Sequence, residues 1–433
     1  MILIKNIKEI YTMNESNFKI EEGYIIIKEN IIQEIGETPV PKKEKMNNIH
    51  FDKIINGENT VALPGLINTH THSAMTLLRG FADDLPLKNW LEEKIWPVEA
   101  KLSPEDIYWG SLLAIIEMIK SGTTTFADMY FKMDQIGQAV KKSRIRAVLS
   151  QGLIEANDGK EGLKNAVTFC KKWNNKANKR ITTMLAPHAP YTCSPEYLED
   201  IYEISRNLDL PINIHIAETK NEIKTIQNKY NLRPLELLEK VKLLERPIIG
   251  AHCVHLNEND IELLKNNKVG VAYNPNSNMK LGSGIAPVNL MLKKGIKVGI
   301  GTDGTASNNN LDLIEEAKIG SYLQKANNLD PTLLDVKTMS KMLTINGARI
   351  LHLENLGKLQ PGFLADLILI DIKKDSVFYP HHNNLSNILY AANGNSVKTV
   401  LINGNVVMEN KKITTINEQK VYREVERIGN NLT

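Results

Sequence analysis

The middle of the chain, residues 65–355, alternates short apolar runs with longer stretches whose apolar residues recur every three or four positions. The short runs predict strands and the periodic stretches predict helices. Strands that alternate with helices over this length form a parallel sheet, and about eight such units predict a closed TIM-type (β/α)₈ barrel of the α/β class. The active site of such a barrel lies at the C-terminal ends of its strands.

The two ends of the chain have a different sequence pattern, in which short runs rich in β-branched residues are interrupted by Gly, Asn and Pro. Near the C-terminus, Asn403-Gly404 lies between two apolar runs and predicts a hairpin. We therefore expect a small β-sandwich domain built from both termini, residues 1–64 and 356–433, beside a metal-dependent catalytic barrel of residues 65–355.

Charge and composition narrow the class of protein. The 433 residues include 53 basic and 50 acidic side chains, and the net charge of +3 argues against a nucleic-acid partner. No stretch approaches the ~20 apolar residues of a membrane span, and Lys5 and Lys8 interrupt the apolar start that a signal peptide requires. Three scattered cysteines without a CxxC pair indicate a reducing compartment. We expect a cytoplasmic protein, and we interpret the dense basic stretch from Lys141 to Arg146 as a solvated helix end.

Five predicted strands run into polar residues that a barrel would aim into its mouth. His70 and His72 follow the first strand, and their spacing of two places both side chains on one face. The other endings are, in chain order, His188, His215 with Glu218 beyond it, His252 with His255 beyond it, and Asp303 between Gly301 and Gly304. The two glycines allow close backbone approach around the aspartate.

Each ending has an ordinary explanation when it is taken alone. A single HxH is a weak metal signal, His188 is as readily a buried core histidine, and Glu218 is as readily an exposed loop residue. Five such endings in successive strands are harder to explain structurally. Three imidazoles with one carboxylate fit zinc or ferrous iron better than magnesium, and such a set leaves a coordination position open for water. Water bound there titrates near pH 7, which predicts hydrolytic chemistry.

The same segments resemble the amidohydrolase superfamily, and within it the branch of 5′-methylthioadenosine/S-adenosylhomocysteine deaminases. The resemblance covers nearly the whole chain, and its densest segments are PGLINTHTHSAMTLLRGFADDLPLKNWL, PHAPYTCSPEYL, HIAET, AHCVHL, NPNSNMKLGSGIAPV and GTDGTASNNNLDL. It implies a single metal ion per subunit, zinc with ferrous iron left open, and hydrolytic deamination at C6 of the adenine ring of a small nucleoside.

The resemblance also implies roles for the strand-end residues. The metal ligands would be His70, His72, His215 and Asp303. Glu218 would take a proton from the attacking water and deliver it to ring N1, and His252 would hold and polarise the attacking hydroxide. Asp303 would in addition accept the hydroxide proton and help to pass it to the leaving ammonia.

Substrate contacts carry over in the same way. Glu218 and Asp303 would meet the purine ring, Glu99 would accept hydrogen bonds from the ribose hydroxyls, and His188 would hydrogen-bond the nucleoside. Trp90 would pack against the sugar or the 5′ substituent. Without the resemblance, Trp90 and Glu99 are merely an aromatic residue and an acid on a predicted helix.

One departure from the branch bears on the substrate. Where some members carry an arginine, this chain has Gln151, and a second expected arginine is missing from the segment EANDGKEG. Those arginines suit the amino-acid carboxylate of S-adenosylhomocysteine, because a guanidinium binds a carboxylate through two hydrogen bonds. Lys160 or Lys164 would be a less exact substitute. We therefore favour 5′-methylthioadenosine, 5′-deoxyadenosine or adenosine, with S-adenosylhomocysteine left open.

Three other readings remain at this point. The scaffold also suits a guanine or cytosine deaminase, or a triazine hydrolase, and a member without catalytic activity would serve as a binding module. The intact metal set and Glu218 argue against the last of these. The sequence leaves open whether the chain forms a homo-oligomer.

Overall fold

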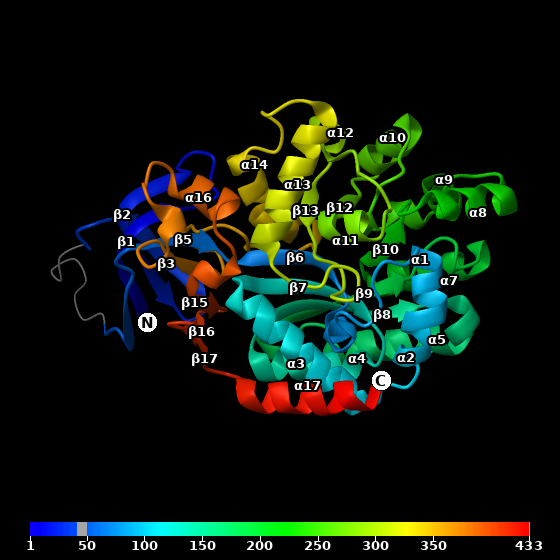
Figure 1. Ribbon diagram of the computed structural model, residues 1–433, viewed down its shortest axis with the longest axis horizontal. Coiled ribbons are helices and arrows are strands. Elements are labelled where there is room, and N and C mark those ends of the chain that lie inside the picture. Colours follow the sequence, from blue (N-terminus) through cyan, green and yellow to red (C-terminus); the bar gives the residue numbers. More distant parts are fainter. Residues whose placement is uncertain (41–49, 433) are drawn as a thin grey trace.

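A barrel of eight parallel strands forms the larger part of the molecule (Figure 1). The computed structural model describes residues 1–40 and 50–432. The barrel strands follow one another in chain order: β6 (Leu66–Thr71), β7 (Thr123–Tyr130), β8 (Arg146–Leu153), β9 (Ile181–Pro187), β10 (Ile212–Ile216), β11 (Ile248–His252), β12 (Gly270–Tyr273) and β13 (Val298–Ile300). The first and last strands meet where the Asp303 N–H donates to the carbonyl of His70 at 3.0 Å. This bond brings together two of the three chain segments that were predicted to bind metal.

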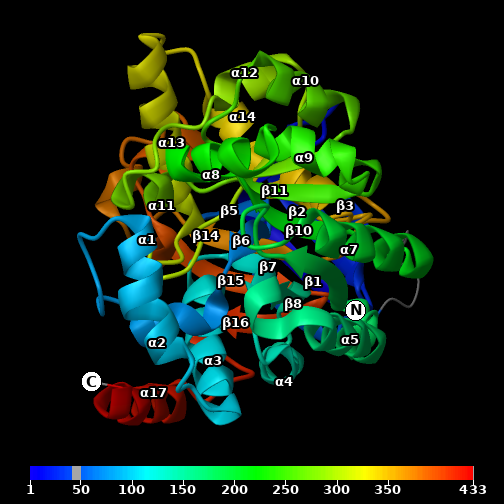
Figure 2. The same cartoon turned by 90° about the vertical axis from the view of Figure 1, so that its right-hand side faces the viewer.

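Helices surround the barrel, as the strand–helix alternation predicted (Figure 2). The longer ones are α3 (Pro104–Lys120), α4 (Met133–Ser143), α5 (Glu155–Trp173), α7 (Pro195–Leu208), α8 (Lys220–Tyr230), α10 (Glu258–Asn266) and α13 (Leu313–Asn328). Shorter helices are α1 (Leu87–Asn89), α2 (Trp96–Glu99), α6 (Lys176–Lys179), α9 (Pro234–Lys240), α11 (Pro275–Lys280), α12 (Val288–Lys293), α14 (Val336–Lys341), α15 (Gly347–Ile350) and α16 (Asn384–Tyr390). A π-helical turn, Trp90–Ile95, joins α1 to α2, and the last helix, α17 (Glu418–Leu432), lies against α3 (Figure 1).

Side chains, not solvent, fill the lower part of the barrel. Residues from six barrel strands form one buried cluster with the end of α15: Ile67, Ala127, Val148, Met184, Ile249, Ala272 and Ile350. Such filling is general in these barrels, so only the opposite, C-terminal end of the strands is free to hold a ligand.

Both termini contribute to a second, mixed sheet beside the barrel (Figure 1). Its order is β17-β16-β15-β14-β5-β1-β2-β3, with β4 beside β1. The bounds are β1 Ile2–Tyr11, β2 Lys19–Lys28, β3 Ile31–Glu37, β4 Lys53–Asn56, β5 Thr60–Pro64, β14 Leu367–Asp371, β15 Val397–Ile402, β16 Asn405–Glu409 and β17 Lys412–Ile413. The two termini join where β5 pairs antiparallel with β14, with Pro64 opposite Leu367. The predicted fold class is therefore confirmed, whereas the domain boundaries at 64/65 and 355/356 stay a proposal.

The hairpin expected at Asn403-Gly404 connects β15 to β16. Both residues have positive φ, 52° and 72°, which is the geometry of a type I′ turn. A side chain on Gly404 would lie 1.8 Å from the carbonyl oxygen of Glu29, so the turn also fits closely against the N-terminal strands. Ile25 from the N-terminal part and Leu401 from the C-terminal part belong to one buried cluster.

A buried ion pair links this sheet to the base of the barrel, and it corrects one prediction. Lys141 and Lys142 end α4, but Arg146 begins β8 and its side chain is only 4% exposed. Its Nε and Nη2 donate to the two carboxylate oxygens of Asp366, at 2.9 and 3.0 Å. Asp366 also accepts the backbone N–H of Asn403 at 2.7 Å. Arg146 was wrongly interpreted as solvated because its partner lies 220 residues away along the chain.

Among the described residues, no helix combines the length and the apolar character that crossing a bilayer requires. The three cysteines, Cys170, Cys193 and Cys253, are buried free thiols.

Candidate active site

Four of the predicted residues meet at the C-terminal mouth of the barrel. His70 comes from β6 and His72 directly follows that strand, His215 comes from β10, and Asp303 follows β13. The Nε2 atoms of His70 and His215 are 3.2 Å apart. Oδ1 of Asp303 lies 3.5 Å from Nε2 of His70 and 3.2 Å from Nε2 of His72. His70, His72 and His215 therefore offer ligand atoms within 4.8 Å of one another, a spacing that one metal ion can bridge.

Two of the three histidines, His72 and His215, are held by a hydrogen bond on the side that faces away from the cluster. Nδ1 of His72 lies 2.5 Å from the carbonyl oxygen of Met129, and Nδ1 of His215 lies 2.7 Å from that of His188. A carbonyl only accepts, so these Nδ1 atoms carry the hydrogen and the Nε2 lone pairs point inward. Burial lowers the pKa of His70 to about 4, which keeps that ring neutral and able to bind metal.

Asp303 is oriented in the same manner by two hydroxyl groups. Its Oδ2 accepts from Ser277 Oγ at 2.6 Å and from Ser307 Oγ at 2.9 Å, while Oδ1 faces the histidines. The glycines beside it are needed for space. A Cβ on Gly301 would lie 2.4 Å from Asn274 Oδ1, and one on Gly304 would lie 2.5 Å from the sulfur of Met75. The prediction of close backbone approach around Asp303 is therefore correct.

Glu218 and His252 face each other beside this cluster. Nε2 of His252 lies 3.9 Å from Oε2 of Glu218. Nδ1 of His252 lies 2.8 Å from Oδ1 of Asn278, an arrangement that leaves Nε2 directed at the cavity. Burial raises the pKa of Glu218 above its ordinary value, which suits a carboxyl group that takes up and releases a proton near neutral pH.

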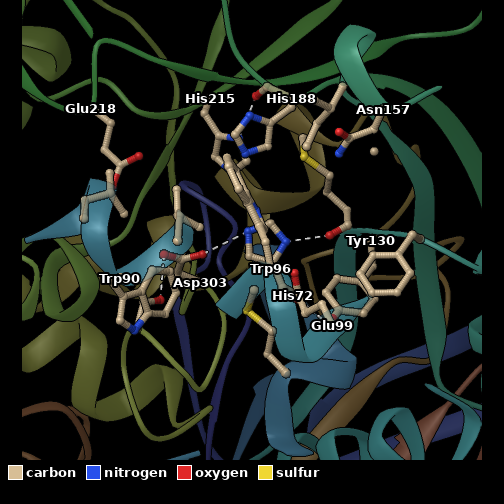
Figure 3. Close-up of a pocket in the computed structure, with 18 of the residues that line it drawn as sticks. His72, Trp90, Trp96, Glu99, Tyr130, Asn157, His188, His215, Glu218 and Asp303 are labelled. Carbon is tan, nitrogen blue, oxygen red and sulfur yellow. Dashed lines mark hydrogen bonds and ion pairs between the residues drawn. The ribbon is translucent and has the colours of Figure 1, made fainter. Parts of the chain in front are cut away.

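A cavity of about 390 Å³ opens above the cluster (Figure 3). Glu99 lies in its wall and accepts the hydroxyl of Tyr130 at 2.5 Å. Burial raises the pKa of Glu99 to about 7, against the opposing effect of the Tyr130 hydrogen bond. Trp90 donates its indole N–H to the carbonyl of Ala82 at 2.9 Å, which fixes the ring at the cavity edge.

All the predicted site residues except His70 line this cavity, and His70 lies beneath it as part of the metal cluster. Nδ1 of His188 lies 3.2 Å from Thr192 Oγ1. The two lysines considered for an anionic substrate, Lys160 and Lys164, are exposed and do not belong to the described cavity lining. Among the described lining residues, Lys132 is the one lysine or arginine.

Several functional neighbours had no role in the sequence prediction. Ser277, Asn278 and Ser307 lie within segments quoted for the resemblance. Their contacts with Asp303 and His252 depend on where helix α11 and the turn at Ser307 lie over the barrel. Tyr130 ends β7 and His72 directly follows β6, so the rule of polar strand ends could have found Tyr130. Trp96 and Tyr191 also line the cavity, and nothing in their spacing distinguishes them from core aromatics.

Comparisons with known proteins agree with this geometry. The sequence profile of the amidohydrolase family matches residues 61–407. The 5-methylthioadenosine/S-adenosylhomocysteine deaminase of Halothermothrix orenii is 58% identical over 99% of both chains, and that of Carboxydothermus hydrogenoformans is 50% identical over 99% of this chain and 97% of its own. A crystal structure of a zinc-bound adenosine deaminase from Xanthomonas campestris superposes with a TM-score of 0.94 at 31% identity, covering 100% of this chain and 98% of the other.

Proposed function

The chain belongs to the amidohydrolase family, and from that premise we propose that it hydrolyses the C6 amino group of adenine in a small nucleoside. The products are ammonia and the corresponding inosine analogue. One observation carries the proposal: the cluster of His70, His72, His215 and Asp303 lies at the floor of the same cavity as Glu218 and the wall residue Glu99. A metal-dependent hydrolase that acts on a nucleoside needs these three elements within reach of a single ligand.

The donor set suits zinc. Three imidazoles and one carboxylate match the ligands that zinc takes in hydrolases, and hydrogen bonds on the side away from the cluster orient His72, His215 and Asp303. When bound, the ion supplies Lewis acidity that lowers the pKa of water towards neutrality. The zinc in the Xanthomonas campestris deaminase favours zinc over iron.

The protein residues then move two protons, each of which is first accepted and then delivered. Glu218, as the carboxylate, accepts a proton from the attacking water and delivers it to N1 of the ring, while the oxygen bonds to C6. Nε2 of His252, 3.9 Å from Glu218, holds the attacking oxygen in place. The remaining hydroxyl proton passes through Asp303 to the amino group, and the C6–N bond breaks to release ammonia.

The cavity wall offers groups for the sugar. The Glu99 carboxylate accepts hydrogen bonds from the two ribose hydroxyls, and Trp90 packs against the sugar or its 5′ substituent. The Tyr130 hydroxyl already donates to Glu99, so one carboxylate oxygen is oriented before the substrate binds. His188 contributes a ring nitrogen from the opposite wall.

The lining favours a neutral 5′ substituent. Lys132 lies at the cavity, but its ammonium donates to the backbone carbonyl of Leu102. A single, already engaged ammonium binds a carboxylate less firmly than a pair of arginines. We therefore place 5′-methylthioadenosine, 5′-deoxyadenosine and adenosine before S-adenosylhomocysteine, which the names of the relatives keep in the substrate range.

A substrate panel tests the proposal. The zinc-loaded protein is assayed by the loss of adenine absorbance with those four nucleosides, and with guanine, cytosine and a chlorotriazine as controls for other hydrolases on this scaffold. Turnover of the adenosine derivatives that disappears in Glu218→Gln supports the proposed function. Turnover of a control compound alone assigns the protein to another reaction, and no turnover at all makes it a non-catalytic member.

A further inference from the structure

The turn that carries Glu218 is held by a second glutamate with no role in the proton transfers above. The carboxylate of Glu222 accepts the backbone N–H of Ala217 at 2.8 Å and that of Glu218 at 2.9 Å. Glu222 lies in the first turn of α8, where Thr219 caps the helix by accepting the N–H of Glu222 at 3.1 Å. A glutamate at this position ordinarily reaches back to the N–H of the capping residue itself.

Helix α9 provides that ordinary arrangement for comparison. Its Glu236 accepts the N–H of the capping residue Arg233 at 2.8 Å. Glu222 reaches one and two residues further back, out of the helix and into the loop at the end of β10. Its hydrogen bonds therefore fix the loop backbone in front of the helix.

The loop needs such support because its backbone is strained. Ala217 has φ 51°, a left-handed conformation that is unfavourable for a residue with a Cβ. The strained residue also connects two strands, since its carbonyl accepts the N–H of Val254 at 3.1 Å and that of His255 at 2.9 Å. Those residues follow His252, which itself has φ 71°. One peptide unit thus ties the loop after β10 to the loop after β11.

We propose that Glu222 is a positioning residue for the reaction, which sets the distance between Glu218 and His252 by fixing the Ala217 turn. The inference rests on the proposed function, because it assigns Glu222 to the placement of the proton carrier in that reaction. Glu222 does not itself reach the cavity, since it is only 3% exposed and is not among the described lining residues.

Glu222 is a costly residue to bury, and its hydrogen bonds offset part of that cost. Burial raises the pKa of Glu222 to about 8, and the two backbone N–H groups act in the opposite direction by favouring the carboxylate. A buried carboxyl group is costly unless its hydrogen bonds are made. An apolar residue could fill the same space, but it could not hold two N–H groups of a strained turn.

The test compares Glu222→Gln with the matched control Glu236→Gln. The glutamine oxygen still accepts one N–H, but the amide nitrogen presents hydrogens to the other, so the turn loses one of its two anchors. We expect kcat for 5′-methylthioadenosine to fall at least 30-fold in Glu222→Gln, with KM within threefold of wild type and one zinc ion per chain retained. Glu236→Gln should keep wild-type kcat, because its cap lies on a different helix. A crystal structure of Glu222→Gln should show Glu218 displaced from its position opposite His252.

Other results overturn the inference. A kcat within threefold of wild type, an equal loss in Glu236→Gln, or a loss that follows zinc content would each show that Glu222 is not a positioning residue. If the wild-type protein deaminates no nucleoside, the proposed function fails, and the crystal structure decides alone. Glu218 unmoved in Glu222→Gln would then refute the link between the two glutamates.

Discussion

The buried pair between Arg146 and Asp366 permits a quantitative prediction about how the two parts of the molecule are joined. The side chains are 4% and 1% exposed, and two parallel hydrogen bonds connect them. Asp366→Asn leaves Arg146 charged and buried, beside Arg180, whose pKa burial already lowers to about 10. Removal of one partner from such a pair costs about 3–5 kcal/mol, because the other charge remains uncompensated.

The double variant separates this cause from a simple loss of packing. Arg146→Met with Asp366→Leu removes both charges. It leaves the Asn403 N–H without its acceptor, at a cost of about 1–3 kcal/mol, and takes the Arg146 donor from the Lys179 carbonyl and from Asn403 Oδ1. The double variant should therefore be more stable than either single variant. Arg146→Met alone should lose about as much stability as Asp366→Asn, because it leaves the Asp366 carboxylate buried without a partner.

Urea unfolding followed by circular dichroism measures these differences, with thermal midpoints as a second readout. A loss of 3–5 kcal/mol corresponds to a fall in Tm of about 3–5 °C, because an unfolding entropy of ~2.1 cal/mol/K per residue amounts to about 0.9 kcal/mol/K for 433 residues. The active site lies at the other end of the barrel, so kcat/KM at 20 °C should stay within about twofold of wild type by the additivity expected for distant sites. The reasoning is refuted if either single variant loses less than ~1 kcal/mol, or if the double variant loses the sum of the two.

Four shorter predictions concern the site. Glu218→Gln should lower kcat/KM by roughly 10²–10⁴-fold with unchanged zinc content, because it removes the proton carrier; zinc lost together with activity would contradict this. Ser277→Ala should weaken zinc binding about 10–100-fold in a chelator competition, because Asp303 loses the hydroxyl that orients it; an unchanged affinity would show that Ser307 suffices. Burial raises the pKa of Glu99 to about 7, so ribose binding by the carboxylate should weaken as pH falls, and kcat/KM should drop about tenfold between pH 8 and pH 6; Glu99→Gln should remove this limb, and an identical profile in that variant would assign it to another group. Lys132→Met should reduce kcat/KM for S-adenosylhomocysteine more than for 5′-methylthioadenosine, and an equal effect on both would exclude Lys132 from carboxylate binding.

The strand ends were the most predictable part of the site. In a parallel barrel every strand ends at the same rim, so a histidine or aspartate that follows an apolar run must lie at that rim. For this reason His70, His215 and Asp303 could be grouped from the sequence, although more than 200 residues separate His70 from Asp303. The mixed sheet built from both termini was predicted on similar grounds, because the two ends of the chain share short runs of β-branched residues.

The supporting contacts could not be foreseen in the same way. Ser277 reaches Asp303 from the short helix α11 and Ser307 from a turn, and a single serine in either place carries no periodic signal. Glu222 has the ordinary appearance of a helix-start glutamate, and only the backbone of Ala217 reveals that it reaches further. Arg146 was misjudged for the same reason, since its environment depends on a strand from the far end of the chain.

The pairing of β5 with β14 also has a consequence for how the molecule is made. Pro64 and Leu367 lie opposite each other, so β5 leaves the ribosome about 300 residues before its partner. At 5–20 residues per second, that delay is roughly 15–60 s. During this delay the strand Thr60–Pro64 has an open edge, and open edges of this kind pair with other chains. Every position of this strand is buried in the folded molecule. Termination after the last barrel strand but before residue 367 should therefore yield a product that aggregates although all its barrel strands are present. Chaperones that shield exposed strands should be needed most during this interval.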